Sequence, residues 1–328
     1  MATKDPASTT LSISCQNDCK EIHDSWGRLS HLAQALASRS KHERRQIRET
    51  YKEMYGENLI DRLQITQKSG KKGLIGIFSN LCEILLLWML DQHERDVVIA
   101  REAIEQEETN YKALVEIFVG RKSSHFLLMN QVYAKRYKRQ LEQDINDIEP
   151  PHPYQRILVA LAASQKAHYV DVSQHVAKCD ARRLFETGEG RAGSLDENVV
   201  LEILSKRSIS QFKQTLSSYK HIYGHDYTKA VRRGSSCEFE EALKMVIKCL
   251  YKPYSYYAKT LNASIKSMVK DDGALARVLI SRAEVDIEEI QKMFKKKYGM
   301  ELRDAICERV PSGDYRNFLA ALVTSTST

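Results

Sequence analysis

Two histidines and one glycine–lysine segment are the candidates for a zinc site and a phosphate-binding loop. His221 and His225 stand four residues apart, as in a helical zinc pair, but Gly224 is expected to end the helix between them. The segment SGKKG at 69–73 lacks the spacing of a phosphate-binding loop, and no HExxH motif occurs. These residues predict neither a nucleotide site nor a zinc enzyme.

The seven cysteines indicate a reducing compartment. They form no CxxC pair, their number is odd, and residues 1–20 contain no continuous apolar run of the kind found in secretion signals. The sequence therefore predicts a cytoplasmic protein with free thiols. Cys15 and Cys19, four residues apart, leave a local disulfide open as an alternative.

The composition favours helices and a modest positive charge. The 328 residues include 14 glycines and 6 prolines, below the usual shares of roughly 7% and 5%. Strands and turns use both types, whereas helix interiors exclude them, so we predict an all-α protein. The formal net charge of +7 is too small for this length to indicate a nucleic acid partner.

One apolar stretch, at 73–90, could be a membrane span or a buried helix. It reaches the minimum length of a span, but it contains Asn80 and Glu83. Because a carboxylate in the middle of a bilayer is costly, we expect a buried helix.

These residues are positioned by an internal repeat that aligns on four arginines, Arg39, Arg121, Arg207 and Arg282. Each arginine follows one apolar helical face and precedes a second helix that carries two aromatic residues. The aromatic pairs are Tyr51/Tyr55, Tyr133/Tyr137, Tyr219/Tyr223 and Phe294/Tyr298. The next residue is a glycine that fits a helix end in three copies. In the second copy it is Lys138, for which we expect a less regular turn.

Each copy closes with a strongly apolar segment, at 81–90, 154–163, 239–250 and 315–324. Segments this apolar must pack against neighbouring helices. The repeat arginines stand at the ends of buried helices, where a cation favours the helix dipole, so we expect a structural role for them.

The repeats resemble those of the annexins. The segments LLLWMLDQHERD (85–96), RYKRQLEQDI (136–145) and SGDYRNFLAALV (312–323) are similar to the plant branch in particular. The resemblance implies an all-α fold of four repeats of about five helices each, forming a curved disc whose convex face binds anionic phospholipid through calcium. The expected division is a tail at 1–11, repeat 1 at 12–96 with an insert near 64–80, repeat 2 at 97–166, a linker and repeat 3 at 167–260, and repeat 4 at 261–328.

The calcium ligands that the resemblance implies are largely missing. The family motif Gly-x-Gly-Thr falls on Asp24/Trp26/Gly27, Gln106/Glu108/Thr109, Ala192/Ser194/Leu195 and Ser267/Val269/Lys270. The later acidic ligand falls on Cys82, Gln155, Glu240 and Arg316. Calcium prefers carbonyl and carboxylate oxygens, and only the third repeat keeps a carboxylate. The residual candidate is Glu240 with the backbone near Gly193 and Ser194, and the alternative is that Glu240 is a solvated loop residue.

Basic loop residues and one tryptophan suggest a membrane contact that needs no calcium. Each Lys or Arg beside an anionic bilayer contributes about 1 kcal/mol, and tryptophan favours the interface. The candidates are Trp26, Arg28, Lys71, Lys72, Arg232, Arg233 and Lys270. The alternative is that these residues are solvated and contact nothing.

The haem binding and peroxidase activity that the resemblance also implies are not supported by the residues of this sequence. The histidine implied for haem binding falls on Ser38, so we expect no haem and no peroxidase activity. The predicted function is that of a non-enzymatic, cytoplasmic protein bound peripherally to anionic phospholipid membranes, with weak calcium binding. The alternative is a calcium-independent scaffold for protein partners.

Overall fold

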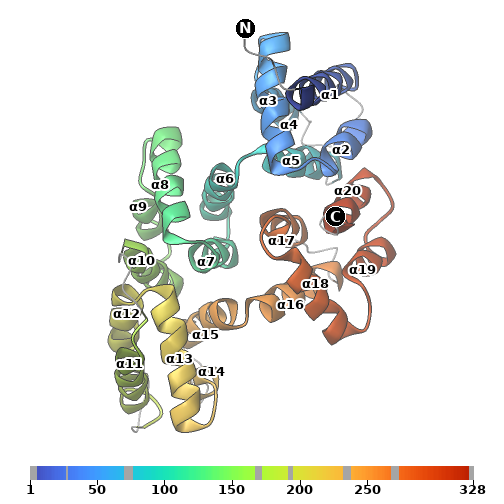
Figure 1. Ribbon diagram of the computed structural model, residues 1–328. Coiled ribbons are helices and arrows are strands. Elements are labelled where there is room, and N and C mark those ends of the chain that lie inside the picture. Colours follow the sequence, from blue (N-terminus) through green and yellow to red (C-terminus); the bar gives the residue numbers. More distant parts are fainter. Residues whose placement is uncertain are drawn as a thin grey trace. The chain divides into compact units, whose positions relative to one another are not determined.

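The computed structural model describes residues 6–26, 29–69, 77–166, 172–190, 195–231, 238–266 and 273–324. Every regular element in these ranges is an α-helix (Figure 1). The first repeat contains α1 (Pro6–Asp24), α2 (Leu29–Ala37), α3 (Lys41–Tyr55), α4 (Leu59–Ser69) and α5 (Ile77–Met89). The second contains α6 (Gln92–Glu105), α7 (Tyr111–Gly120), α8 (Ser123–Tyr137), α9 (Leu141–Asn146) and α10 (Pro153–Lys166).

The other two repeats follow the same order. The third contains α11 (Gln174–Glu186), α12 (Glu197–Lys206), α13 (Ile209–Tyr223), α14 (Tyr227–Ala230) and α15 (Glu238–Tyr251). The fourth contains α16 (Pro253–Lys266), α17 (Ala274–Arg282), α18 (Ile287–Tyr298), α19 (Leu302–Arg309) and α20 (Asp314–Thr324). The expected boundary between residues 260 and 261 falls inside α16, so the first helix of the fourth repeat begins earlier than expected. The predicted all-α fold with five helices per repeat is confirmed.

The chain divides into two compact units that do not follow its linear order. The first unit combines Met1–Arg95 with Tyr257–Thr328, and the second is Asp96–Tyr256. The first and fourth repeats therefore share one unit, while the second and third share the other. Helices α6 and α16 each contribute residues to both units.

The core of the first unit is built on α5 and α20. Helix α20 packs against α2, α5, α17 and α19. Arg95 is 1% exposed and donates hydrogen bonds to the carbonyls of Leu87 (2.7 Å) and Ile280 (2.9 Å), which ties the first repeat to the fourth. Residues 81–90 are buried except Glu83, as expected for a buried helix. No helix in the described ranges is long and apolar enough to cross a membrane.

The core of the second unit is built on α10. This helix packs against α7, α9, α12 and α15, and α11 packs against α13. The aromatic residues of the repeat complete both cores, since Tyr51, Tyr133 and Tyr219 are fully buried and Phe294 is 1% exposed. Burial explains why the repeat keeps an aromatic residue at this position.

The expectation of a less regular turn after α8 is wrong. Lys138 has a φ of 57° and its N–H donates to the carbonyl of Ala134 at 3.0 Å. Gly56, Gly224 and Gly299 end their helices in the same left-handed conformation, with φ of 69°, 77° and 75°. Lys138 therefore adopts the glycine geometry, although a Cβ makes that geometry unfavourable.

Two other expectations concern local structure. Helix α1 begins at Pro6, so the expected tail at 1–11 is helical from residue 6 onward. Most of the insert near 64–80 falls within α4 and α5, and 70–76 lie outside the described residues. The thiols of Cys15 and Cys19 are free and buried, and they contact Thr50 and the carbonyl of Ile47.

Candidate functional site

The repeat arginines pair with buried aspartates. Arg121 contacts Asp96 through two hydrogen bonds (2.6 and 2.9 Å), and Arg207 contacts Asp180 in the same way (2.7 and 3.0 Å). Burial alone would raise the pKa of Asp96, but Arg121 and His125 lower it to about 2. These arginines have the expected structural role, and the sequence did not indicate their aspartate partners.

The first and fourth repeats vary this pair. Arg39 contacts Asp18 at 2.7 Å. Arg282 turns instead to Asp286, one helical turn later, at 2.7 Å. Its guanidinium also lies 4.7 Å from the ring of Tyr257, which stands in α16 where the other repeats have aspartate. The pairing therefore survives in all four repeats, with a local partner in the last.

The position expected to hold the acidic calcium ligand has a different chemistry in each repeat. The thiol of Cys82 is buried, with 3% of the residue exposed, and burial raises its pKa. Gln155 donates to the carbonyls of Ile148 (2.7 Å) and Ile145 (3.1 Å), and its Oε1 accepts from the N–H of His152 (2.5 Å). The amide of Gln155 therefore acts mainly as a hydrogen-bond donor that closes the loop before α10.

Arg316 has a related arrangement in the fourth repeat. Its guanidinium donates to the carbonyl of Cys307 at 3.3 Å, near the end of the preceding helix α19. A cationic donor beside a helix carboxyl end is favourable, and it leaves no anionic ligand at this position. In the second and fourth repeats, the side chain at the expected ligand position donates hydrogen bonds to backbone carbonyls in or just after the preceding helix.

Glu240 differs from these three residues. It is 4% exposed, and its Oε2 has no hydrogen-bond partner among the described residues. Burial raises its pKa, while Lys244 opposes the shift. The Tyr227 hydroxyl is likewise buried without a hydrogen-bond partner in the described ranges. Two buried oxygens in one repeat that lack hydrogen bonds match the requirement of a cation or a bound water.

Glu189 is a second carboxylate near this position, and the sequence pattern did not indicate it. It accepts a hydrogen bond from Tyr219 and contacts Nε2 of His225 at 2.8 Å. Glu189 and Glu240 both raise the pKa of Tyr227, after the larger effect of burial. The signal was a glutamate beside Gly190 in the first loop. Gly193 and Ser194 lie outside the described residues, and no cluster of three metal-ligating side chains occurs within the described ranges.

Of the seven lipid-binding candidates, only Trp26 is placed. Its ring lies 4.1 Å from the guanidinium of Arg62, and the residue is partly exposed. Arg28, Lys71, Lys72, Arg232, Arg233 and Lys270 lie outside the described residues. Arg62 could not be predicted from the sequence, because its contact joins a residue of α4 to one just after α1, and such a contact leaves no sequence pattern.

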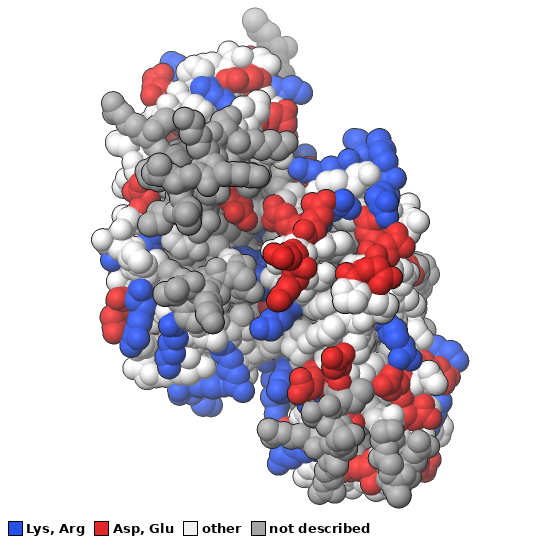
Figure 2. All heavy atoms as spheres, turned by 180° about the vertical axis from the view of Figure 1, so that it is seen from behind, with Lys and Arg blue, Asp and Glu red and all other residues white. Residues whose placement is uncertain are grey.

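The corresponding loop of the second repeat is acidic. Glu105 at the end of α6 is exposed, as are Glu107 and Glu108 between α6 and α7. Asn110 caps α7 by accepting from the N–H of Ala113 at 3.2 Å. The face drawn in Figure 2 likewise carries patches of both signs rather than one continuous basic surface. Charge is therefore distributed loop by loop, and the loop between α6 and α7 carries acidic rather than basic side chains.

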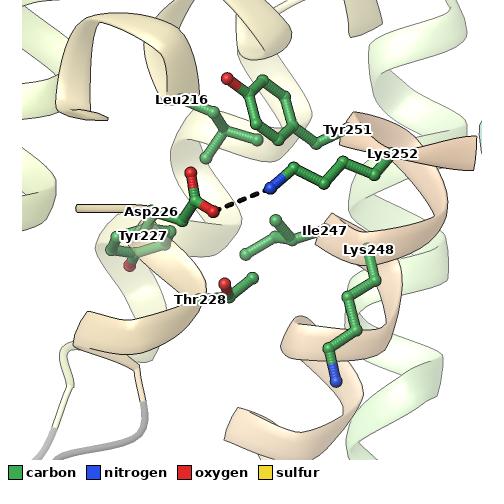
Figure 3. Close-up of a pocket in the computed structure, with 8 residues that line it drawn as sticks. All are labelled: Leu216, Asp226, Tyr227, Thr228, Ile247, Lys248, Tyr251 and Lys252. Carbon is green, nitrogen blue, oxygen red and sulfur yellow. Dashed lines mark hydrogen bonds and ion pairs between the residues drawn. The ribbon is translucent and has the colours of Figure 1, made fainter. Parts of the chain in front are cut away.

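A cavity of about 40 Å³ lies between α13, α14 and α15. Figure 3 shows Asp226 at its wall, paired with Lys252 at 2.9 Å, while Lys248 points away. Leu216, Ile247 and the ring of Tyr251 supply an apolar lining. A volume of this size suits a water molecule and is too small for a nucleotide or a lipid headgroup.

Comparisons with known proteins agree with this geometry. The family model described as Annexin matches residues 21–71, 95–161, 179–246 and 256–322. Annexin A4 of Mus musculus is 34% identical over 289 residues, which cover 88% of this chain and 86% of that protein. Annexin Gh1 of Gossypium hirsutum is 33% identical over 325 residues, 98% of each chain. The structure of annexin III has a TM-score of 0.82 at 28% identity, with 94% of this chain and 93% of that chain covered.

Proposed function

This chain belongs to the annexin family, and from that premise we propose that it binds anionic phospholipid membranes peripherally with a weakened dependence on calcium. The family is known for calcium-dependent phospholipid binding. What distinguishes this member is the set of side chains that occupy the ligand positions.

The observation that carries the proposal is the use of Gln155 and Arg316 as hydrogen-bond donors to backbone carbonyls. A calcium ion needs about six to eight oxygen ligands, of which the carboxylate supplies the charge. An amide whose nitrogen faces two carbonyls cannot replace that carboxylate, and a guanidinium would repel the ion. The second and fourth repeats are therefore proposed to bind no calcium.

The third repeat is the proposed residual calcium site. The residues present fit a cation there, because Glu240 is buried with an oxygen that accepts no hydrogen bond in the described ranges. The backbone near Gly193 and Ser194 would complete the coordination. A single site of this kind predicts weak binding, since isolated carboxylate ligands need several converging oxygens.

Basic side chains and Trp26 are proposed to bind the protein to the membrane when calcium is absent. The proposed contacts are Arg28, Lys71, Lys72, Arg232, Arg233 and Lys270, each worth about 1 kcal/mol beside an anionic bilayer. Such binding is screened by salt. The proposal places the protein at cytoplasmic membrane surfaces, without enzymatic activity and without haem, nucleotide or nucleic acid.

Co-sedimentation with phosphatidylserine/phosphatidylcholine vesicles tests the proposal in calcium, in chelator and in chelator with high salt. We expect binding in chelator that high salt abolishes, and a loss of that binding in the double charge reversal of Arg232 and Arg233 to glutamate. Glu240→Gln should remove the calcium-dependent increment, while Glu241→Gln, at an exposed neighbouring position, should keep it.

Two outcomes would contradict the proposal. Binding that requires calcium absolutely would show that the other ligand positions are intact in function. An absence of binding under all three conditions would favour the alternative, a scaffold that binds protein partners through the helical surface.

A further inference from the structure

Helix α8 of the second repeat carries an exposed apolar pair that the corresponding helices lack. Leu127 and Leu128 are 49% and 50% exposed. Counted from the repeat arginines, the same two positions hold Arg45 and Gln46 in α3, Lys213 and Gln214 in α13, and Glu288 and Glu289 in α18. The residue just before them is buried in all four helices, so each helix presents the same face to solvent. Three repeats therefore keep this face polar, and the second makes it apolar.

The carboxyl end of α8 is strongly basic. No acidic residue occurs between positions 121 and 140, and Lys135, Arg136 and Lys138 are exposed. Among the described residues none of these three has an ion-pair partner, whereas Arg139 is paired with two aspartates. In Figure 2, blue side chains gather at the end of the second unit that carries the end of α8, beside a group of red ones.

The backbone of Lys138 is strained in a way that the fold does not require. Its φ is 57°, and within the described ranges it is the one residue other than glycine with a positive φ. A Cβ makes this conformation costly, and glycine stands at this place in the other three repeats. The helix dipole favours cations in the last turn, but Lys135 and Arg136 already supply them. Such an outlier points to a function of the Lys138 side chain.

The two leucines and two of the lysines lie on one face of α8. Residues three and four positions apart are neighbours on a helix surface, so the exposed Gln131 adjoins both Leu127 and Leu128. Lys135 follows Gln131 by the same spacing, and Lys138 comes at the end of the helix. We call these residues the α8 stripe, which extends over about three helical turns. The stripe begins with an apolar pair and ends in positive charge.

We propose that the α8 stripe is a docking surface for an acidic amphipathic helix of a protein partner. Leucine side chains of the partner would cover Leu127 and Leu128, because burial of this pair removes apolar area from water. Carboxylates of the partner would contact Lys135 and Lys138, and these contacts would fix its direction along α8. The inference goes beyond the proposed membrane function and does not depend on it.

A single helix fits this surface better than an anionic bilayer does, because exposed carboxylates border the basic end. Asp147 pairs with Arg139 just after α8. Glu105 stands at the end of α6, whose Arg101 lies 5.3 Å from the ring of Tyr137. A flat anionic surface would meet these carboxylates together with the lysines and would be repelled by them, whereas one helix can follow the stripe and avoid them.

The probe is a fluorescein-labelled helical peptide of leucine and glutamate, with the leucines on one face. Fluorescence anisotropy measures its binding to the whole protein in chelator. Two control peptides replace its glutamates by lysine or its leucines by glutamine. We expect the first peptide to bind, with an affinity that falls as salt is raised, and both control peptides to bind much more weakly.

Variants of the stripe are matched by variants of α13, the corresponding helix of the third repeat. The double variant Leu127→Gln/Leu128→Gln and the single variant Lys135→Glu should each weaken binding of the acidic peptide about tenfold. Ile222→Gln, at a residue that is 38% exposed, and Lys213→Glu, at an exposed lysine, should bind as wild type.

Lys138→Gly separates binding from stability. Glycine adopts the left-handed conformation at this place in the other repeats, so the variant keeps the backbone and removes one cation of the stripe. It should bind the acidic peptide about threefold more weakly, while its urea midpoint does not fall. Weaker binding of this variant then has its cause in the lost charge and not in a loss of folding.

The inference would be overturned if wild type failed to bind the acidic peptide, or bound all three peptides equally. An affinity that is unchanged in any stripe variant would overturn it as well. Dimerisation of wild type that Leu127→Gln/Leu128→Gln abolishes would instead assign the stripe to a second copy of this chain. Binding to phosphatidylserine/phosphatidylcholine vesicles in chelator that the same variant abolishes would assign the stripe to the bilayer. Either result would replace the proposed partner.

Discussion

The second and third repeats share one compact unit and the same five-helix plan, yet they treat one position oppositely. Gln155 at the start of α10 satisfies both halves of its amide with backbone partners. Glu240, at the same place in α15, is buried with an oxygen that accepts no hydrogen bond in the described ranges. The comparison teaches that an amide and a carboxylate at the same place act differently: the amide closes a loop as a hydrogen-bond donor, whereas the carboxylate keeps an oxygen for the proposed cation.

The two repeats share a pair between the repeat arginine and a buried aspartate, and removal of the aspartate tests this pair. Asp96→Ala takes the carboxylate away from Arg121, whose side chain is 5% exposed, and should cost about 3–5 kcal/mol of unfolding free energy. Asp180→Ala should cost less, about 1–3 kcal/mol, because the Arg207 side chain is 30% exposed and can be solvated. Urea unfolding measures both values.

The same pair predicts a pH dependence. Because the folded pKa of Asp96 is lowered to about 2, its stabilisation is complete above the unfolded value of about 4. That stabilisation is lost as the pH falls from about 4 toward 2, and Asp96→Ala should lack this loss. Equal costs for the two alanine variants would show that burial of the arginine does not decide the strength of the pair.

The contrast between Gln155 and Glu240 is tested by exchanging the two residues. Gln155→Glu would place carboxylate oxygens against two carbonyls and should cost about 1–3 kcal/mol in chelator. Millimolar calcium should recover part of that loss if the loop can supply further ligands. Thermal unfolding with and without calcium measures the effect, and Gln143→Glu, at an exposed position in the preceding helix, is the control.

Glu240→Gln should not lower the stability at neutral pH, in contrast to Gln155→Glu. Burial raises the pKa of Glu240, so the folded protein takes up this proton at a higher pH than the unfolded chain does. Stability due to this group therefore rises as pH falls through the folded pKa and is lost as pH rises. In chelator, Glu240→Gln should be at least as stable as wild type at pH 7, with a flatter profile toward about pH 4.5. A variant less stable at pH 7 would show that the carboxylate has a protein partner.

The sequence was sufficient for the repeats but not for the partners of individual side chains. The spacing of apolar residues predicted the helices, because burial of one helical face leaves a periodic trace. The donor role of Gln155 depends on the path of the loop before α10, and the contact of Arg62 with Trp26 depends on the angle between helices. Neither leaves a periodic trace. The first repeat packs with the fourth, which is distant in the sequence. A pattern of neighbouring residues could not predict this contact.

The smallest expected effect concerns the ends of α8 and α13. Lys138 holds a left-handed conformation that Gly224 adopts at the same place in the third repeat. No Cβ opposes this conformation in glycine, whereas a residue with a Cβ loses about 1–2 kcal/mol there. Glycine also loses more chain entropy on folding, which offsets part of the gain. Lys138→Gly should therefore stabilise the protein by up to about 1 kcal/mol, and Gly224→Ala should destabilise it by about 1 kcal/mol. Opposite shifts in the urea midpoint at unchanged slope would support this reading. A loss of stability in both variants would mean that the Lys138 side chain makes contacts worth more than its backbone strain.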